Sequence, residues 1–301
     1  MLSVIGGYRC LSGMQTTGSG TARWCLAMQG MDRYFLKEFL SPVYPSDAST
    51  PIGKRQLERC KQFEKKKQLL YAAASCVIGD VLVPVVNFFR ENGHYYAVSE
   101  AVPEGCQTVD QAWRMTTREK KALLYELALG LQRMHAQGIV HADLKPAHIF
   151  LFPSEEGWKP RLIDFDSGFL QDSPPQTEKE LEGDPVYLSP EMFLRMAGEQ
   201  AWLGAAADTF AFGAIIHQIW NGNLPEFDHE RYRYLYEAVL EGDEIHLELP
   251  KAWEKTVRRM LSADPLDRPT DAEITALFAA KRTLASSSVL NGLKQLMKSG
   301  E

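Results

Sequence analysis

The sequence contains few cysteines, and none of them has the spacing of a metal site or a disulfide framework. The five cysteines are scattered singly along 301 residues: Cys10, Cys25, Cys60, Cys76 and Cys106. No C-x-x-C or Cys/His pair has the spacing of a zinc site. An odd number of cysteines without a recognisable secretion signal argues against a disulfide-stabilised secreted protein. We therefore expect a reducing, cytoplasmic location.

A long hydrophobic run is also lacking. The longest apolar stretch, TFAFGAIIHQIW, is about half as long as a membrane-spanning helix and contains His217. The opening residues, MLSVIGGYRC, are too short and too rich in glycine for the apolar core of a signal peptide. We therefore expect neither secretion nor membrane association.

Positive charge is scarce as well. Lys and Arg total 33 against 39 Asp and Glu, which gives a formal net charge of −6. Because nucleic-acid binding depends on clustered cations, this balance argues against nucleic acid as a main partner. The dense basic run Lys65-Lys66-Lys67 has the pattern of a solvated helix face. Nothing in the sequence indicates an oligomeric state.

What the sequence does contain is a β-rich first third. ARWCLAM and DRYFLKEF alternate apolar and polar residues around Gly30, which predicts a hairpin. VLVPVVNFFR and HYYAVSEAV predict two further strands joined by the turn ENG. Between these pairs, QLERCKQFEKKKQLLYAAA has helical spacing. Its apolar residues lie close to one face: Leu57, Cys60, Phe63, Leu69 and Leu70.

From residue 104 onward, helical patterns dominate. KKALLYELALGLQRMHAQG, DTFAFGAIIHQIWNG and AWEKTVRRMLSA predict amphipathic or buried helices, ended by Gly or followed by Pro. The end, NGLKQLMKSGE, is consistent with a short helix or a frayed tail. A sheet-rich part and a helical part would bury separate cores and leave a cleft between them, where ligands usually bind. The fold class is therefore predicted to be α+β.

The most specific pattern is HADLKPAHIFL, from His141 to Leu151. It resembles the catalytic loop H-R-D-L-K-P-x-N of the eukaryotic-like (Hanks-type) Ser/Thr protein kinases. Phosphoryl transfer needs a positioned hydroxyl, neutralised phosphates and metal ions rather than covalent chemistry. By this resemblance Asp143 would orient the substrate hydroxyl or accept its proton, and Lys145 would offset charge on the moving phosphoryl group.

The resemblance extends from about Tyr8 to Leu277 and suggests a divergent, bacterial member of the family. It implies the bilobal protein-kinase fold. Residues 1–103 would form a β-rich N-lobe with one main helix, and residues 104–301 a mainly helical C-lobe. The implied reaction is transfer of the γ-phosphoryl group of ATP to Ser/Thr hydroxyls of protein substrates, with autophosphorylation as an option. The implied metal ion is Mg²⁺ or Mn²⁺.

Three residues are candidate metal ligands. In LIDFDSG, which resembles the family's D-F-G, Asp164 would bind the Mg²⁺ that bridges the ATP phosphates. Asp166 replaces the Gly of that motif, and either adds a carboxylate to the metal site or points to solvent. His148 stands where the family has a metal-binding Asn. An imidazole there either binds the metal, with a preference for Mn²⁺ or Zn²⁺ over Mg²⁺, or supports the loop by a hydrogen bond.

Lys37, in YFLKEF, occupies the place of the strand lysine in the family's V-A-I-K. By the resemblance it contacts the α- and β-phosphates and forms an ion pair with a Glu of the following helix. We expect this partner to be Glu64 rather than Glu58, because Glu64 lies deeper in the helix and next to Phe63.

The nucleotide site is expected to include backbone and apolar contacts. SGMQTTGSGTARW holds Gly18 and Gly20 at the place of the family's Gly-rich loop, without its G-x-G-x-x-G spacing, and small residues let backbone N–H groups approach phosphate. AVSEAVPEG resembles the hinge that binds adenine. Its small Ser99 would guard the back of the pocket. The expected nucleotide contacts are Gly18, Gly20, Lys37, Glu100, Val102 and Phe150.

The C-terminal motifs distinguish protein kinases from kinases of small molecules. GDPVYLSPE resembles the segment that receives a peptide and ends in A-P-E, here at Glu191. Asp208, in DTFAFG, resembles the buried Asp that holds the catalytic-loop backbone. Arg268, in DPLDRPT, resembles the arginine that pairs with that Glu. These three residues are expected to support the fold rather than to react.

Two further departures leave alternatives open. Ala142 replaces the arginine of H-R-D, which normally binds a phosphate on the activation loop, so we predict activity without loop phosphorylation. Asp184 replaces a Thr and is placed to pair with Lys145. An active protein kinase is favoured because Lys37, Asp143, Lys145 and Asp164 are all present. The alternatives are an ATP-binding pseudokinase scaffold and a small-molecule or glycan kinase.

Overall fold

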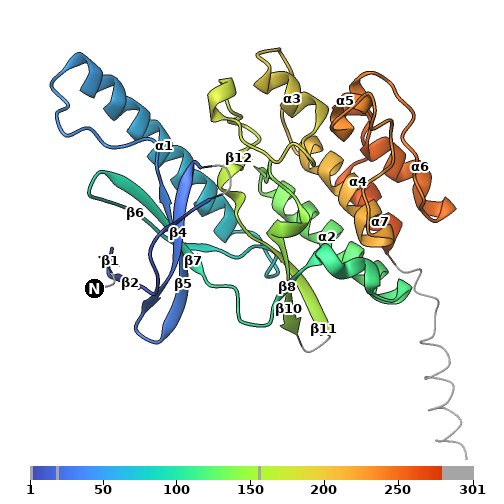
Figure 1. Cartoon of the computed structure of the whole chain (residues 1–301), viewed down its shortest axis with the longest axis horizontal. Helices are drawn as coiled ribbons and strands as arrows, with labels where there is room; N and C mark the ends of the chain where they lie inside the picture. Colours follow the sequence, from blue (N-terminus) through green and yellow to red (C-terminus); the bar gives the residue numbers. More distant parts are fainter. Residues whose placement is uncertain (1–2, 18–19, 155–156, 280–301) are drawn as a thin grey trace, which may run out of the picture.

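The structure is a computed structural model that describes residues 3–17, 20–154 and 157–279. Figure 1 shows the β-rich first part on one side of the molecule and the helical part on the other. The predicted α+β architecture with two parts is therefore confirmed. The C-terminal segment NGLKQLMKSGE lies outside the described residues.

The first part is built on one antiparallel sheet in the order β1-β2-β4-β5-β7-β6, with β3 paired to β4. Its strands are β1 (Val4–Ile5), β2 (Tyr8–Cys10), β3 (Gln15–Thr16), β4 (Ala22–Gln29), β5 (Asp32–Phe39), β6 (Val85–Glu91) and β7 (His94–Glu100). Both predicted hairpins, β4–β5 and β6–β7, are confirmed. The register places Lys37 of β5 between Trp24 and Ala97, in the middle of the sheet.

Helix α1 (Pro51–Ser75) is the one long helix of this part. It begins before the predicted segment because Thr50 caps it, accepting a hydrogen bond from the Gly53 N–H, and Pro51 fits the first turn. The buried positions follow a seven-residue spacing from Gly53 through Cys60 and Lys67 to Ala74. The prediction that the basic run is a solvated face is therefore wrong at Lys67, which is buried.

In the described residues, the second part contains six α-helices, several short 3-10 helices and several short strands. In order these are β8 (Gln107–Thr108), η1 (Val109–Arg114), α2 (Thr117–Ala136), β9 (Ile139–Val140), η2 (Pro146–His148), β10 (Ile149–Ser154), β11 (Gly157–Leu162), η3 (Phe165–Ser167), β12 (Phe169–Leu170), η4 (Glu178–Glu180), α3 (Pro190–Met196), α4 (Ala206–Asn221), α5 (Leu235–Leu240), α6 (Lys251–Met260), η5 (Pro265–Asp267) and α7 (Asp271–Phe278). The three helices predicted from sequence correspond to α2, α4 and α6. In the described ranges, no helix has both the length and the apolar content that a membrane crossing needs.

Two short sheets fix the loops that carry polar residues. β10 pairs with β11 and β8, and β12 pairs with β9 so that Phe169 lies opposite Val140. Gly168 allows this close approach, because a Cβ there would lie 2.7 Å from the carbonyl oxygens of both Val140 and Phe165. The loops at 141–148 and 164–168 are therefore held next to each other.

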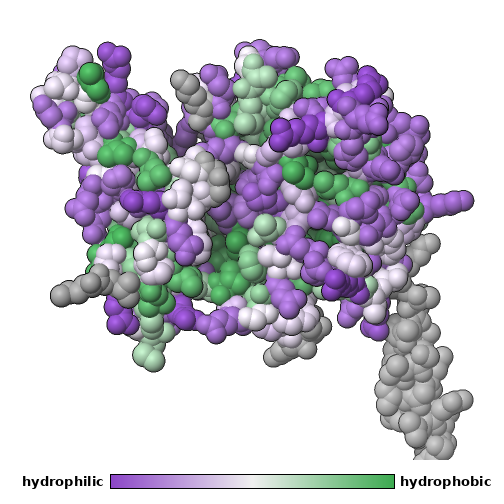
Figure 2. All heavy atoms as spheres, viewed as in Figure 1, coloured by the Kyte–Doolittle hydropathy of each residue, from purple (hydrophilic) through white to green (hydrophobic). Residues whose placement is uncertain are grey.

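The expectation of separate cores is only partly met. One hydrophobic cluster runs through both parts, joining Leu70 and Tyr71 of α1 to Leu124 of α2 and to Phe165. Smaller clusters lie on the outer side of the first sheet and among α3, α4 and α5. The cores merge because the apolar stripe of α1 faces the second part as well as the sheet. Figure 2 shows a face that is hollowed between the two parts, with hydrophobic residues inside the hollow.

Candidate active site

The loop after β9 is held from below by Asp208 of α4. The buried carboxylate of Asp208 accepts hydrogen bonds from the backbone N–H groups of His141, at 2.7 Å, and Ala142, at 2.9 Å. Ala142 has a φ of 64°, a left-handed conformation that costs a residue with a side chain roughly 1–2 kcal/mol. Bonds to a charged acceptor are strong enough to offset that cost. Asp208 therefore sets the direction in which the next residue, Asp143, leaves the loop.

A buried histidine completes this support. His135 of α2 lies between two carboxylates, with Nε2 at 3.0 Å from Asp208 and Nδ1 at 2.9 Å from Asp271. Burial opposes the charged imidazolium, yet the hydrogen bonds to Asp208 and Asp271 raise the pKa of His135 to about 9. The imidazolium links α2, α4 and α7. Sequence reasoning did not find His135, whose partners are distant in the chain.

The free energy of unfolding is expected to fall as the pH rises from about 6.5 to about 9. The pKa of His135 is raised on folding, so its charge stabilises the fold below its unfolded pKa of about 6.5, and this stabilisation is lost as the pH rises through about 9. At about 1.4 kcal/mol per pKa unit, the loss is on the order of 3 kcal/mol. Chemical denaturation at pH 6, 7.5 and 9 measures it, and His135→Gln should flatten the profile. A wild-type profile as flat as that of the variant would contradict the assignment.

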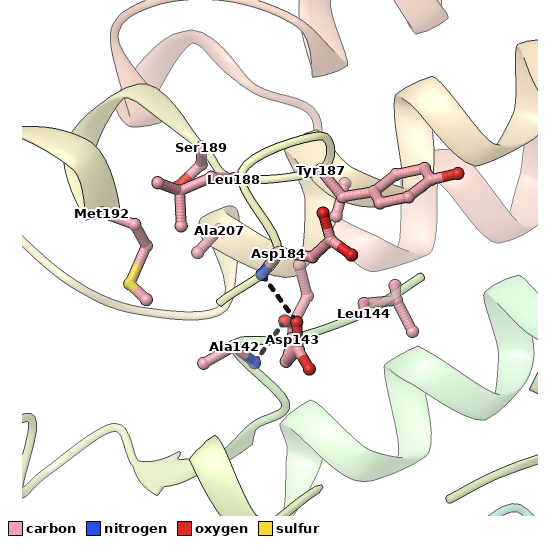
Figure 3. A pocket seen from close by; sticks show the side chains of 11 residues that line it. Ala142, Asp143, Leu144, Asp184, Tyr187, Leu188, Ser189, Met192 and Ala207 are labelled. Atoms are coloured by element: carbon pink, nitrogen blue, oxygen red, sulfur yellow. Dashed lines mark hydrogen bonds between the residues drawn. The ribbon is translucent and has the colours of Figure 1, made fainter. Parts of the chain in front are cut away.

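Asp143 lies at the edge of a small pocket together with Asp184 and Tyr187 (Figure 3). One carboxylate oxygen of Asp143 accepts a hydrogen bond from the Asp184 N–H at 2.8 Å, and the other lies 3.0 Å from the Lys145 ammonium. Lys145 is also 3.6 Å from the Asp184 carboxylate, the pairing expected from the sequence. The pocket has a volume of about 10 Å³, room for about one water-sized group such as a hydroxyl. The carboxylate of Asp143 and the ammonium of Lys145 therefore lie side by side at this pocket.

His148 and Asp164 face each other across the loops. His148 Nδ1 lies 2.9 Å from the Asp143 carbonyl oxygen, and His148 Nε2 lies 3.8 Å from Asp164 Oδ2. Burial lowers the pKa of the His148 imidazole, and His141 and Lys145 lower it further against the opposing effect of Asp164 and Asp143. The neutral imidazole therefore donates from Nδ1 to the carbonyl, which leaves the lone pair of Nε2 on the side of Asp164.

These two groups fit a divalent metal ion that is shared with phosphate. In the described part of the chain, no group of three or more His, Cys, Asp or Glu is arranged to hold a metal by itself. Mg²⁺ bound with ATP needs only one or two protein ligands, because phosphate and water oxygens fill the remaining positions. The Asp164 carboxylate and the His148 Nε2 supply that number. A metal held here would neutralise charge on the phosphates.

Lys37 reaches the loop that carries Asp164. Its ammonium lies 2.6 Å from Asp164 Oδ1 and 2.9 Å from Asp166 Oδ2. Burial alone would lower the pKa of Lys37, but Asp166 and Asp164 raise it above its ordinary value. The expected partner, Glu64, is elsewhere. Glu64 accepts a hydrogen bond from the Tyr95 hydroxyl at 2.8 Å and lies 3.9 Å from Arg90. The predicted Lys37–Glu64 pair is therefore corrected.

Asp166 does not point to solvent. Its carboxylate accepts a hydrogen bond from the Tyr71 hydroxyl at 2.6 Å and lies 3.7 Å from the Lys67 ammonium. Burial opposes its ionisation, but Lys37 and Lys67 hold the pKa of Asp166 well below its usual range. Burial also lowers the pKa of Lys67, and Asp166 opposes that shift. Lys67 and Tyr71 were missed from the sequence, although both lie on the buried stripe of α1.

The predicted nucleotide contacts come from both parts of the molecule. Gly18 lies outside the described residues, and Gly20 has a φ of 72° in the turn between β3 and β4, where glycine is favoured. Glu100 ends β7, and Val102 follows it, half-buried. Ser99 is half-buried on the same strand, and Phe150, half-buried on β10, pairs with Thr108. Their contacts to a nucleotide stay predictions.

The segment before α3 is tied to the first part through two of its acidic side chains. Lys66 of α1 donates to the Glu180 carboxylate, and the Thr21 hydroxyl donates to Glu182 at 3.4 Å. These are exposed contacts of modest strength. Activity without loop phosphorylation stays a prediction, and these acidic residues are compatible with it.

Glu191 and Arg268 form a buried, two-pronged ion pair. Arg268 Nη1 and Nη2 each lie 2.7 Å from one oxygen of Glu191, and both side chains are almost fully inaccessible. Arg268 also donates to the Ala206 carbonyl at 2.7 Å and the Ser262 carbonyl at 3.0 Å. The pair joins the start of α3 to the start of α4 and the loop after α6.

A comparison with known families shows to which family the chain belongs. The family model described as protein kinase domain matches residues 60–279, well over half of the chain. The chain belongs to the protein kinase family. The match begins within α1, so strands β1–β5, with Lys37, lie outside it. Protein kinases use ATP and a divalent metal ion, which agrees with the residues gathered around Asp164.

Several curated proteins are similar to this protein kinase domain. Serine/threonine-protein kinase pkn2 of Myxococcus xanthus is 30% identical over 177 residues, which cover 56% of this chain and 20% of that protein. Serine/threonine-protein kinase ULK3 of Rattus norvegicus is 30% identical over 194 residues, which cover 62% of this chain and 39% of that protein. Calcium-dependent protein kinase 5 of Arabidopsis thaliana is 30% identical over 166 residues, which cover 52% of this chain and 28% of that protein. The chain therefore spans less than half the length of these relatives.

Proposed function

We propose that this protein transfers the γ-phosphoryl group of ATP to serine or threonine hydroxyls of proteins, its own chain included. The observation that carries the proposal is one continuous set of contacts. It runs from Lys37 through Asp164 and His148 to Asp143 and Lys145. These are the charges that phosphoryl transfer needs, because the reaction depends on positioning and on neutralising phosphate oxygens.

Each residue has a distinct role in the proposed reaction. Asp143 orients the acceptor hydroxyl and takes its proton as the oxygen bonds to the γ-phosphorus and the bond to the β–γ bridging oxygen breaks, leaving ADP. Lys145, beside Asp143, offsets negative charge on the transferred group. Lys37 binds the remaining phosphates. Asp164 and His148 would hold Mg²⁺ or Mn²⁺, which supplies charge neutralisation when bound.

The acceptor is proposed to be a protein in the cytoplasm. The relatives named as serine/threonine-protein kinases support a Ser or Thr acceptor, and Lys145 two residues after Asp143 supports the same class. Free thiols at all five cysteines support a reducing compartment. The net charge of −6 offers nothing for nucleic-acid binding.

The test is transfer of labelled γ-phosphate to generic protein acceptors and to the protein itself, with Mg²⁺ and with Mn²⁺. We expect labelled Ser or Thr with both metals. The transfer rate with Mn²⁺ should be high relative to that with Mg²⁺, because imidazole is a better ligand for Mn²⁺ than for Mg²⁺. Protein treated with phosphatase should keep its rate if loop phosphorylation is not required. Clear stabilisation by ATP without transfer under any condition would overturn the proposal in favour of a pseudokinase scaffold. Label appearing only on sugar acceptors would favour a glycan kinase.

A further inference from the structure

The face of α1 that meets the active site presents the ammonium of Lys67, whereas the expected carboxylate, Glu64, contacts other residues. The Lys67 side chain is almost fully buried, and its ammonium donates to the Asp166 carbonyl oxygen. This ammonium also lies over three aromatic rings: Phe39 at 5.0 Å, Phe63 at 5.6 Å and Tyr71 at 5.9 Å. Such rings attract a cation that has lost its water. Lys67 is thus held by specific contacts in the interior, unlike an exposed lysine of a solvated helix face.

The carboxylate comes instead from the loop of Asp164. Asp166 contacts Lys37 of β5 at 2.9 Å, and Tyr71 and Lys67 of α1 at 2.6 Å and 3.7 Å. One carboxylate therefore joins the sheet, the helix and the loop. The helix is held at the same place by a ring contact, since Tyr71 and Phe165 have ring centroids 6.1 Å apart.

The charges of Lys67 and Asp166 depend on each other electrostatically. Lys37 and Lys67 carry two positive charges, and Asp164 and Asp166 carry two negative ones. The side chains of Lys37, Lys67 and Asp166 are largely buried, and that of Asp164 is partly exposed. A buried charge without a partner is strongly unfavourable. A carboxylate at position 67 would face Asp166, and a neutral residue at position 166 would leave Lys67 unpaired. The charge of each residue is therefore tolerated because of the other.

We propose that Lys67 and Asp166 are an exchanged pair. Asp166 positions Lys37 in place of a carboxylate on α1, and Lys67 anchors α1 to Asp166. This inference rests on the proposed function and adds two positioning residues to it, both acting through Lys37. One consequence is that Lys37 keeps a carboxylate partner when Asp164 faces a metal ion. Another is that the position of α1 and the position of Lys37 depend on the same carboxylate.

The test is a charge-exchange cycle. Three variants are compared with the wild type: Asp166→Gly, Lys67→Glu and the double variant with both changes. The matched control is Lys65→Glu, the same charge change at an exposed position of the same helix. Initial rates of labelled γ-phosphate transfer give kcat and the KM values for ATP and for the protein acceptor. Circular dichroism checks that each variant is folded.

Each single variant is expected to lower kcat by about 10²-fold, because a displaced catalytic lysine costs this much, and to raise the KM for ATP but not the KM for the acceptor. The double variant should recover to within about tenfold of the wild type, since a Glu at 67 can then pair with Lys37. Lys65→Glu should stay within about twofold. Losses that multiply in the double variant, or a wild-type kcat in Asp166→Gly, would overturn the proposal. If Asp166→Gly does not fold, Asp166→Asn takes its place as the single variant.

Failure of the proposed function would be recognised separately. If the wild type transfers no phosphate but binds ATP with Mg²⁺, the transfer activity is refuted and the exchanged pair is tested by the Kd for ATP. Weaker binding by about tenfold or more in each single variant, with recovery in the double variant, would still support the pair. Unchanged binding in the single variants would refute it.

Discussion

Replacing Asp143 by asparagine is expected to lower the rate of γ-phosphoryl transfer by about 10²–10⁴-fold, the contribution typical of a positioned general base. The amide keeps the shape of the carboxylate, and its oxygen can still accept the hydrogen bond that the Asp184 N–H now donates. It cannot take a proton from the acceptor hydroxyl, and it removes the negative charge next to Lys145. The loss should therefore appear in kcat.

Binding and stability separate this effect from unfolding. Asp143→Asn is expected to leave the Kd for ATP and the thermal midpoint close to those of the wild type. The reason is that Asp143 is proposed to contact the acceptor hydroxyl, whereas Lys37, Asp164 and His148 are proposed to hold the nucleotide phosphates and the metal. Asp172→Asn, the same change at an exposed position, should have the wild-type rate. A rate of Asp143→Asn within a few-fold of the wild type would show that Asp143 does not act as the base.

Replacing Arg268 by methionine is expected to lower the free energy of unfolding by about 3–5 kcal/mol, as is typical when one partner of a buried ion pair is removed. Glu191 would be left buried and charged, with both of its oxygens deprived of their 2.7 Å partners. The carbonyl groups of Ala206 and Ser262 would also lose a donor. Urea denaturation followed by tryptophan fluorescence measures the change.

The control for this experiment is an exposed ion pair. Arg33 pairs with Glu104 at the surface, where both side chains are at least half exposed, so Arg33→Met should cost less than about 1 kcal/mol. Removing both buried charges, with Arg268→Met and Glu191→Leu together, should recover part of the loss, since no charge is then left unpaired. An equal cost for Arg268→Met and Arg33→Met would contradict the assigned role of the buried pair.

Local motifs were enough to locate much of the candidate site. Asp143 and Lys145 share one loop, and Asp164 follows a short apolar strand. Their places in the fold can therefore be predicted from short local motifs. The family match covers residues 60–279, which include these three residues. Asp208 is placed in the same way, by the resemblance of DTFAFG to the family's buried helix. Its hydrogen bonds to His141 and Ala142 show why that position is acidic.

The partner of Lys37 could not be chosen in this way. Glu64 was preferred over Glu58 for its depth in the helix, but Glu64 faces Tyr95 and Arg90. The seven-residue spacing from Cys60 to Lys67 and Ala74 was a signal that position 67 faces inward. That signal was obscured because the residue there is a lysine within a run of three lysines.

The sequence by itself determined the kinds of elements and the two-part architecture, and its resemblance to protein kinase motifs is the basis for the proposed phosphoryl-transfer residues. Those features depend on periodicity and on short spacings, which are local properties of the chain. Only the tertiary structure decided which carboxylates pair with Lys37 and Lys67. Lys37 is separated from Asp166 by more than a hundred residues, and Lys67 lies between them in sequence. Whether these three meet depends on how α1 packs between the sheet and the loop of Asp164, because a buried charge is stabilised by whatever opposite charge the packing brings within reach.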